Sequence, residues 1–213
     1  MLVFDYLSEM AMSRRKPAED RKTEIIAALL DLADRIGPDR LTTNDIARDV
    51  GVTQAAIFRH YPTKAALWSA AGLVISDRLG AAWAQALAAE TTPKGRLRAL
   101  IAAQLAQIEA CPALPAILHS RELNVDNPDL RERFRGVLTQ YQGHLVANLE
   151  GMIADGSLAR HVRPLDAAVL LTSLVQGIAI RWGLGSRGFG LKVEGLRLLD
   201  VQLALFACKE GSG

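Results

Sequence analysis

The sequence has only two cysteines, Cys111 and Cys208, and they lie far apart. Two isolated thiols give neither the paired Cys/His spacing of a zinc site nor the disulfide framework of a small secreted protein. Four histidines are scattered along the chain: His60, His119, His144 and His161. None of them lies in a metal-ligand spacing, and no nucleophile elbow is present. We therefore expect a reducing, cytoplasmic location, no metal or other cofactor, and no enzyme activity.

A large excess of charge of either sign is also missing, because the net charge is only +2. Residues 13–64 hold ten Lys/Arg and eight Asp/Glu, and half of those basic residues lie in the arm from Arg14 to Lys22. The cluster Arg14–Lys16 fits either a minor-groove or phosphate contact or an ordinary solvated tail. So small a net charge neither proves nor excludes nucleic-acid binding, and the placement of the charges matters more than their sum.

Long uninterrupted apolar runs are absent as well. No window approaches the ~18 consecutive apolar residues of a membrane span, so no membrane partner is expected. The first twelve residues lack the basic n-region and the long apolar segment of a signal peptide. Because Met10 and Met12 come just before the basic arm, we interpret residues 1–12 as an N-terminal extension, either from an upstream start codon or frayed.

Hydrophobic residues make up 50% of the chain and charged residues 23%, a composition typical of an ordered, helix-rich protein. Apolar residues recur at three- and four-residue steps, and no segment shows the alternation of a β-strand. The sequence therefore predicts an all-α fold of about nine helices. Their expected positions are 19–36, 43–50, 54–60, 64–87, 94–110, 113–121, 128–155, 165–182 and 192–208.

Gly51 separates two short predicted helices near the N-terminus. Thr42 and Asp45 have the spacing of a capping box at the start of the first, and Thr53 is placed to cap the second. A two-turn helix, a glycine turn and a second short helix, braced by a preceding helix, form a helix-turn-helix, which lays its second helix in the major groove of DNA. We therefore assign residues 13–64 to a DNA-binding domain.

The run from Leu41 to Trp68, LTTNDIARDVGVTQAAIFRHYPTKAALW, resembles the DNA-binding module of the tetracycline-repressor (TetR) family. With the first helix, the resemblance covers nearly 50 residues. The family usually has Tyr where this chain has Phe58, so a phosphate hydrogen bond from that phenol is missing here. The resemblance implies these DNA contacts: Thr43, Thr53, Gln54, Ala55, Phe58, Arg59, His60, Tyr61 and Lys64.

These implied contacts divide into residues that position the DNA and residues that read it. Thr43, at a helix N-terminus, and Lys64 would bind phosphates. On the third helix, Gln54 suits adenine and Arg59 suits guanine, although both also fit an ordinary solvated helix face. His60 fits either a phosphate contact or a favourable interaction with the dipole at its own helix end.

A DNA reader needs only about 50 residues, which leaves residues 65–213 for sensing and dimerisation. Polar side chains interrupt the apolar middle helices, as in an apolar cavity with a few orienting polar groups. The resemblance implies a small-molecule effector there, apolar or amphipathic. The expected ligand contacts are Gln104, His119, Glu122, Tyr141 and His144, and the alternative is that these side chains face solvent.

The last two predicted helices, 165–182 and 192–208, are apolar around most of their circumference. Such helices bury against more than one neighbour. In the TetR family the last two helices pair with those of a second copy in a four-helix bundle, although an intramolecular core alone gives much of the same pattern. The expected dimer interface consists of Leu171, Leu174, Val175, Ile178, Leu199, Leu203 and Phe206.

Together these features predict a homodimeric transcriptional regulator of the TetR type: a repressor that a small molecule releases from an inverted-repeat operator in double-stranded DNA. A second hypothesis is a ligand-independent architectural or cell-cycle factor that binds DNA on the same fold. A helical enzyme ranks third, because no catalytic spacing supports it.

Overall fold

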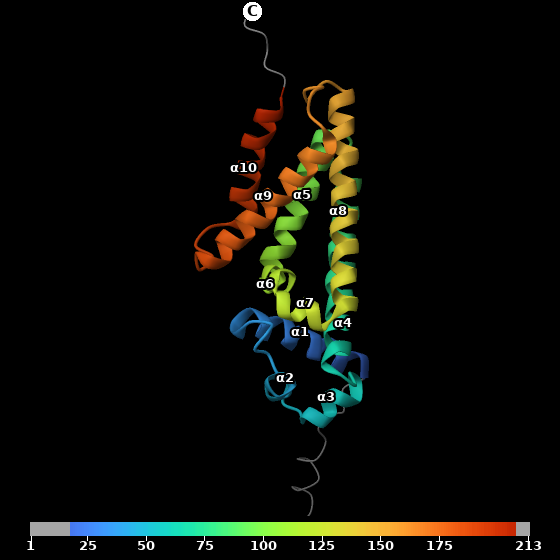
Figure 1. The fold of residues 1–213 in the computed structure, drawn as a ribbon, viewed down its shortest axis with the longest axis vertical. Coiled ribbons are helices and arrows are strands. Elements are labelled where there is room, and N and C mark those ends of the chain that lie inside the picture. The colour runs from blue at the N-terminus through green and yellow to red at the C-terminus, as the bar shows by residue number, and fades with distance from the viewer. Residues whose placement is uncertain (1–17, 208–213) are drawn as a thin grey trace, which may run out of the picture.

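The computed structural model describes residues 18–207, which form ten α-helices and no strand (Figure 1). The all-α prediction is confirmed, with one helix more than expected. The segment near 113–121 divides at Ser120, which ends α6 (Leu114–His119) and caps α7 (Arg121–Asp126) by accepting a hydrogen bond from the backbone N–H of Leu123 at 2.9 Å. The N-terminal extension, the cluster Arg14–Lys16 and Cys208 lie outside the described residues.

Three helices at one end of the molecule form the helix-turn-helix unit: α1 (Ala18–Ile36), α2 (Thr43–Val50) and α3 (Gln54–His60). The capping box at the start of α2 forms as predicted, since Thr42 Oγ1 accepts from Asp45 N and Asp45 Oδ2 accepts from Thr42 N at 3.0 Å. Gly51 ends α2 with φ 73°, a left-handed conformation that glycine adopts without steric cost. The turn therefore holds α3 at a fixed angle to α2.

The long helix α4 (Lys64–Ala88) carries the chain from this unit into a larger helical domain. There it packs against α5 (Pro93–Ala110) and α8 (Pro128–Ala154), and the buried Trp83 contributes to the shared core. The short helices α6 and α7 lie between this bundle and α1 (Figure 1). Of these two, α6 contacts α1 directly.

The chain ends with α9 (Pro164–Leu184) and α10 (Leu191–Phe206), which pack against each other and against α8 and α5. A Cβ atom on Gly195 would lie only 2.5 Å from Leu105 Cδ1, so glycine permits the close approach of α10 to α5. By length and composition α9 could cross a membrane, yet 44% of its most apolar window is buried inside the protein. Core helices of soluble proteins pass the same test, so this one helix is a weak indication of a membrane span.

Two polar contacts join the larger domain to the helix-turn-helix unit. Arg187, in the loop between α9 and α10, forms an ion pair with Asp34 on α1. The guanidinium of Arg187 also lies over the ring of Trp182, 5.3 Å from the ring centroid. The hydroxyl of Ser120 donates a hydrogen bond to Asp39, in the loop between α1 and α2. They add to the packing of α1 against α4 and α6, which also joins the two parts of the chain.

Candidate DNA interface and ligand cavity

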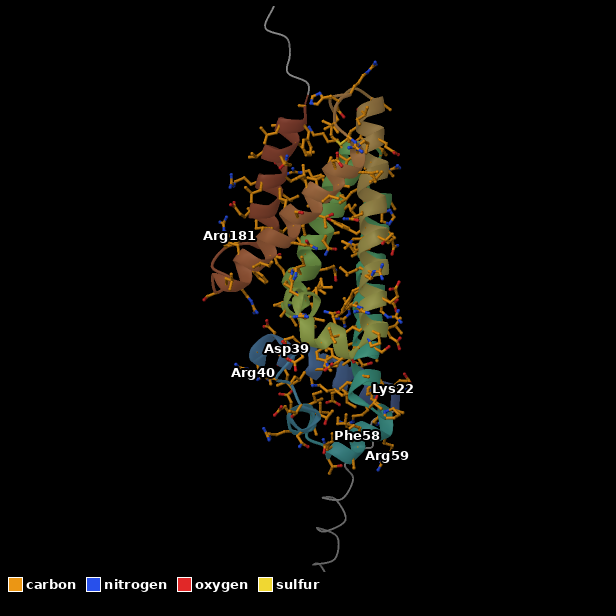
Figure 2. The ribbon with its side chains drawn as sticks, viewed as in Figure 1. Lys22, Asp39, Arg40, Phe58, Arg59 and Arg181 are labelled. Carbon is orange, nitrogen blue, oxygen red and sulfur yellow. The ribbon has the colours of Figure 1, made fainter. Side chains whose placement is uncertain are left out.

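The helix α3 lies at the end of the molecule farthest from α10. Phe58 and Arg59 project from it there (Figure 2), and Phe58 is 38% exposed, although it is a large apolar side chain. Thr53, Ala55 and Lys64 are exposed as well. The structure therefore gathers these five predicted DNA contacts around one exposed helix.

Thr43 and Gln54 are engaged with each other instead of facing solvent. The side-chain amide of Gln54 donates to Thr43 Oγ1 at 2.6 Å, and Thr43 is only 8% exposed. This bond ties the first turn of α3 to the first turn of α2. A base contact from Gln54 therefore requires its amide to leave Thr43 or to use its remaining hydrogen-bonding groups.

Tyr61 turns its hydroxyl towards α1, where it donates to the backbone carbonyl of Lys22 at 3.4 Å. Burial raises the pKa of this phenol, so it is neutral at physiological pH. His60 beside it is half-buried at the end of α3. In this position Tyr61 holds the end of α3 against α1. Its predicted DNA contact stays a prediction.

The carboxylates of Asp45 and Asp49, on the neighbouring helix α2, are hydrogen-bonded or ion-paired within the protein. Hydrogen bonds from the side chain and backbone of Thr42 lower the pKa of Asp45, and Asp49 pairs with Arg35 at 2.9 Å. Among residues 18–207, by contrast, neither Arg59 nor Lys64 forms an ion pair. Unpaired cations at an exposed helix are what phosphate binding requires.

A cavity of about 510 Å³ lies in the larger domain, with walls from α4, α5, α6, α7, α8 and α9. Of the predicted ligand contacts, Gln104, His119 and Tyr141 line it. Glu122 and His144 are not among its lining residues, and their predicted ligand contacts stay a prediction. The break at Ser120 puts Glu122 on a different helix from His119, and His144 packs edge-on against Trp83, with ring centroids 6.3 Å apart.

Polar groups of Trp83, Gln104 and Tyr141 interrupt the largely apolar lining of the cavity. The indole N–H of Trp83 donates to Gln104 Oε1 at 2.9 Å. The hydroxyl of Tyr141 is buried and, within the described part of the chain, has no hydrogen-bond partner. Burial raises the pKa of Tyr141 far above its usual value, so the phenol is neutral. The rings of Trp83 and Tyr141 lie 5.2 Å apart, centroid to centroid.

The cavity also has a charged border that the sequence interpretation missed. Arg121 on α7 and Arg131 and Arg135 on α8 are among its lining residues, and no Asp or Glu is. The sequence spacing could have indicated this border. Arg131, Arg135 and Leu138 are separated by four and three residues, so they lie on one face of a helix.

The structure places most of the predicted dimer residues in the core of the protomer. Leu174 and Phe206 are half-buried, and the other five are buried: Leu171, Val175, Ile178, Leu199 and Leu203. The same two helices do expose large apolar side chains on their opposite faces: Leu165, Val169, Leu170, Ile180, Leu184, Val193, Val201 and Leu205. A helix that is apolar on two faces does not indicate which of them turns inward.

Comparison with known proteins gives matches over both parts of the chain. Residues 25–71 match the family described as "Bacterial regulatory proteins, tetR family", and residues 93–200 match "BetI-type transcriptional repressor, C-terminal". The nucleoid occlusion factor SlmA of Vibrio cholerae serotype O1 is 30% identical over 158 residues, which cover 73% of this chain and 79% of that protein.

Solved structures share the fold at lower sequence identity. The ketosteroid transcriptional regulator KstR2 of Mycobacterium tuberculosis has a TM-score of 0.76 and 18% identity, over 89% of this chain and 96% of that one. The transcriptional regulator FadR from Bacillus subtilis, solved in complex with stearoyl-CoA, has a TM-score of 0.69 and 17% identity, over 85% and 97% of the two chains.

Proposed function

Because the chain belongs to the TetR family of bacterial regulatory proteins, we propose that it is a dimeric repressor that leaves an inverted-repeat operator when a small molecule fills the cavity of its larger domain. The family and fold are those of DNA-binding transcriptional regulators, not of enzymes. Regulators of this family are soluble, and the proposed location is the cytoplasm. The observation that carries the proposal is a roughly 510 Å³ cavity whose wall touches the DNA-binding end through Ser120.

The DNA side of the proposal rests on the exposed residues of α3 and the start of α4. Phe58 and Arg59 would meet the bases, while Lys64 would hold a phosphate. Residues 13–64 would act as the reading head and residues 65–213 as the sensing and dimerising part. A single head reaches only a few base pairs, so specific binding requires two heads on a two-fold site.

The dimer would form through the exposed apolar faces of α9 and α10. Eight large apolar side chains are exposed there in the protomer, an arrangement that favours burial against an identical surface. TetR-family regulators bind DNA as dimers, and the proposed partner is a second copy of this chain.

Two routes connect the cavity to the reading head. Leu79 and Trp83 line the cavity from α4, the helix that begins at Lys64. Ser120 lines it from the start of α7 and donates to Asp39, four residues before α2 begins. A ligand that displaces either wall would change the separation of the two heads. A hundredfold loss of DNA affinity corresponds to a coupling of about 2.7 kcal/mol, and DNA must then weaken ligand binding by the same factor.

The proposal is tested with an operator selected from random duplexes and measured by fluorescence anisotropy at one salt concentration. Half-site centres about one helical turn apart place both heads on one side of the duplex. Inserting five base pairs between the half-sites should reduce affinity to the non-specific level, because one half-site then faces away. Changing the central bases without insertion should cost little unless the DNA must bend. Undiminished binding to the inserted operator contradicts the two-headed arrangement.

A second candidate function comes from the relatives named nucleoid occlusion factor. On that hypothesis the chain binds DNA without a small-molecule effector. Compounds that occupy the cavity separate the two: they release DNA from a ligand-responsive repressor and leave an effector-independent DNA-binding factor bound.

A further inference from the structure

We infer that the effector is an amphipathic organic anion: its carboxylate or phosphate lies against Arg121, Arg131 and Arg135, and its apolar body fills the cavity. This inference rests on the proposed function, in which a small molecule in this cavity controls DNA binding. It adds the chemical class of that molecule, which the cavity walls specify.

The charged residues that line the cavity have one sign. Three arginines from two helices line it and no Asp or Glu does, although the whole chain has nearly as many acids, 23, as basic residues, 25. Arg135 donates to Glu132 at 3.0 Å, whereas within the described part of the chain Arg121 and Arg131 form no ion pair. Guanidinium groups bind carboxylates and phosphates through paired hydrogen bonds, so this border favours an oxyanion.

Next to these arginines the border is apolar. Leu118 on α6, Val125 on α7 and Leu138 on α8 line the cavity and are exposed, although they are large apolar side chains. Deeper in, Trp83 and Phe134 belong to the buried core. A small inorganic anion would leave this apolar surface in water, whereas an amphipathic one would cover it.

The dimensions of the cavity set the length of the apolar body. Arg131, Arg135, Leu138 and Tyr141 follow one face of α8 into the cavity. The ten helical steps from Arg131 to Tyr141 span about 15 Å along the helix axis at ~1.5 Å per residue. A volume of about 510 Å³ lies within the range for drug-sized ligands. A medium-chain fatty acid meets both limits.

Four probes with the same twelve-carbon chain separate charge from apolar character: laurate, lauryl phosphate, dodecanol and dodecylamine. Binding to the full-length protein is followed by calorimetry and by tryptophan fluorescence, because Trp83, one of the three tryptophans, lines the cavity. We expect the two anions to bind at least about tenfold more tightly than the alcohol and the amine, and only their affinity to fall as salt screens the arginines. Equal binding of laurate and dodecanol overturns the inference, as does binding by none of the probes.

Variants then locate the anion. Arg121→Gln and Arg131→Gln should each weaken laurate binding roughly three- to tenfold, the range for removal of a partly exposed charged group, and leave dodecanol binding unchanged. Arg160→Gln is the matched control, because this exposed arginine lies between α8 and α9 and outside the cavity lining. Melting temperatures confirm that each variant folds. Laurate binding that is as tight in the double variant as in wild type overturns the inference.

The proposed function and this inference fail in different ways. If laurate binds in an arginine-dependent manner but does not release the selected operator, regulation by the cavity is wrong and the ligand class stands. If neutral or cationic compounds release the operator while anions do not, the inference is overturned and the proposed repressor function stands.

Discussion

Tyr141→Phe should make the ligand-free protein more stable, because it removes a buried hydroxyl that lacks a partner. Within the described residues, no group accepts from or donates to this hydroxyl, and it has almost no accessible surface, so water in the cavity does not reach it. Phenylalanine keeps the ring and its 5.2 Å contact with Trp83. The substitution therefore deletes one polar atom and little else.

The expected gain follows from the cost of such a group. A buried, unsatisfied hydroxyl costs about 1–3 kcal/mol, and the small gap left by the oxygen returns part of this. We expect the free energy of unfolding to rise by roughly 1–2 kcal/mol, which corresponds to about 2–4 °C in Tm per kcal/mol for a chain of this size. Burial raises the pKa of Tyr141, so the hydroxyl stays protonated and the gain should not change across neutral pH.

The assay is urea unfolding of wild type and variant at equal protomer concentration without ligand, because dimerisation couples stability to concentration. Tyr61→Phe is the matched control: its hydroxyl donates to the Lys22 carbonyl at 3.4 Å, so the same substitution should cost up to about 1 kcal/mol. The two variants should thus shift stability in opposite directions. A drop in stability in Tyr141→Phe would mean that its hydroxyl has a partner, and the reasoning would be refuted.

Further substitutions test the assembly, the DNA contacts and the fold of the reading head. Leu205→Arg puts a charge on the proposed dimer face, where the Leu205 side chain is 73% exposed. Sedimentation equilibrium of this variant should give about 23.0 kDa instead of twice that mass. The control variant Leu73→Arg, at an exposed position on α4, should stay dimeric. A dimeric Leu205→Arg protein contradicts this interface. Lys64→Ala should weaken binding to all DNA sequences and lower the salt dependence of DNA affinity by about one unit for each phosphate that the protein no longer binds. Gln54→Ala should instead relax the preference at particular bases. Identical effects of the two variants across an operator library would show that the two roles are not distinct. Thr42→Ala removes the capping box and should cost about 0.5–2 kcal/mol in urea unfolding, and unchanged stability would count against the cap.

The helix boundaries near the DNA-binding end were predictable because local residues determine them. Thr42, Gly51 and Thr53 each act on backbone groups within three to five residues, and their cap hydrogen bonds are present in the structure. The same holds for the placement of Phe58 and Arg59 on an exposed arc, which follows from helical periodicity alone. Sequence spacing suffices wherever the physical cause acts within one or two turns.

The cavity and the dimer face were less predictable because they depend on contacts between distant segments. Trp83 and Gln104 are hydrogen-bonded across 21 positions of sequence, and nothing local to either residue indicates the other. On α9, Leu171 is buried while Leu170 is exposed, and one residue of helix corresponds to about 100° of rotation. Choosing the outward face of such a helix requires knowing which neighbours cover the other one.

The ion pair between Arg187 and Asp34 restricts which DNA-binding domains of related proteins could replace residues 13–64 of this chain. Its two residues lie 153 positions apart, in the segment before the last helix and in the first helix of the head. A chimera joined simply at the start of α4 would leave Arg187 and Ser120 facing whatever residues the incoming head carries. Grafted heads should therefore keep acidic residues at positions 34 and 39, and heads without them should assemble with altered geometry even when each half folds.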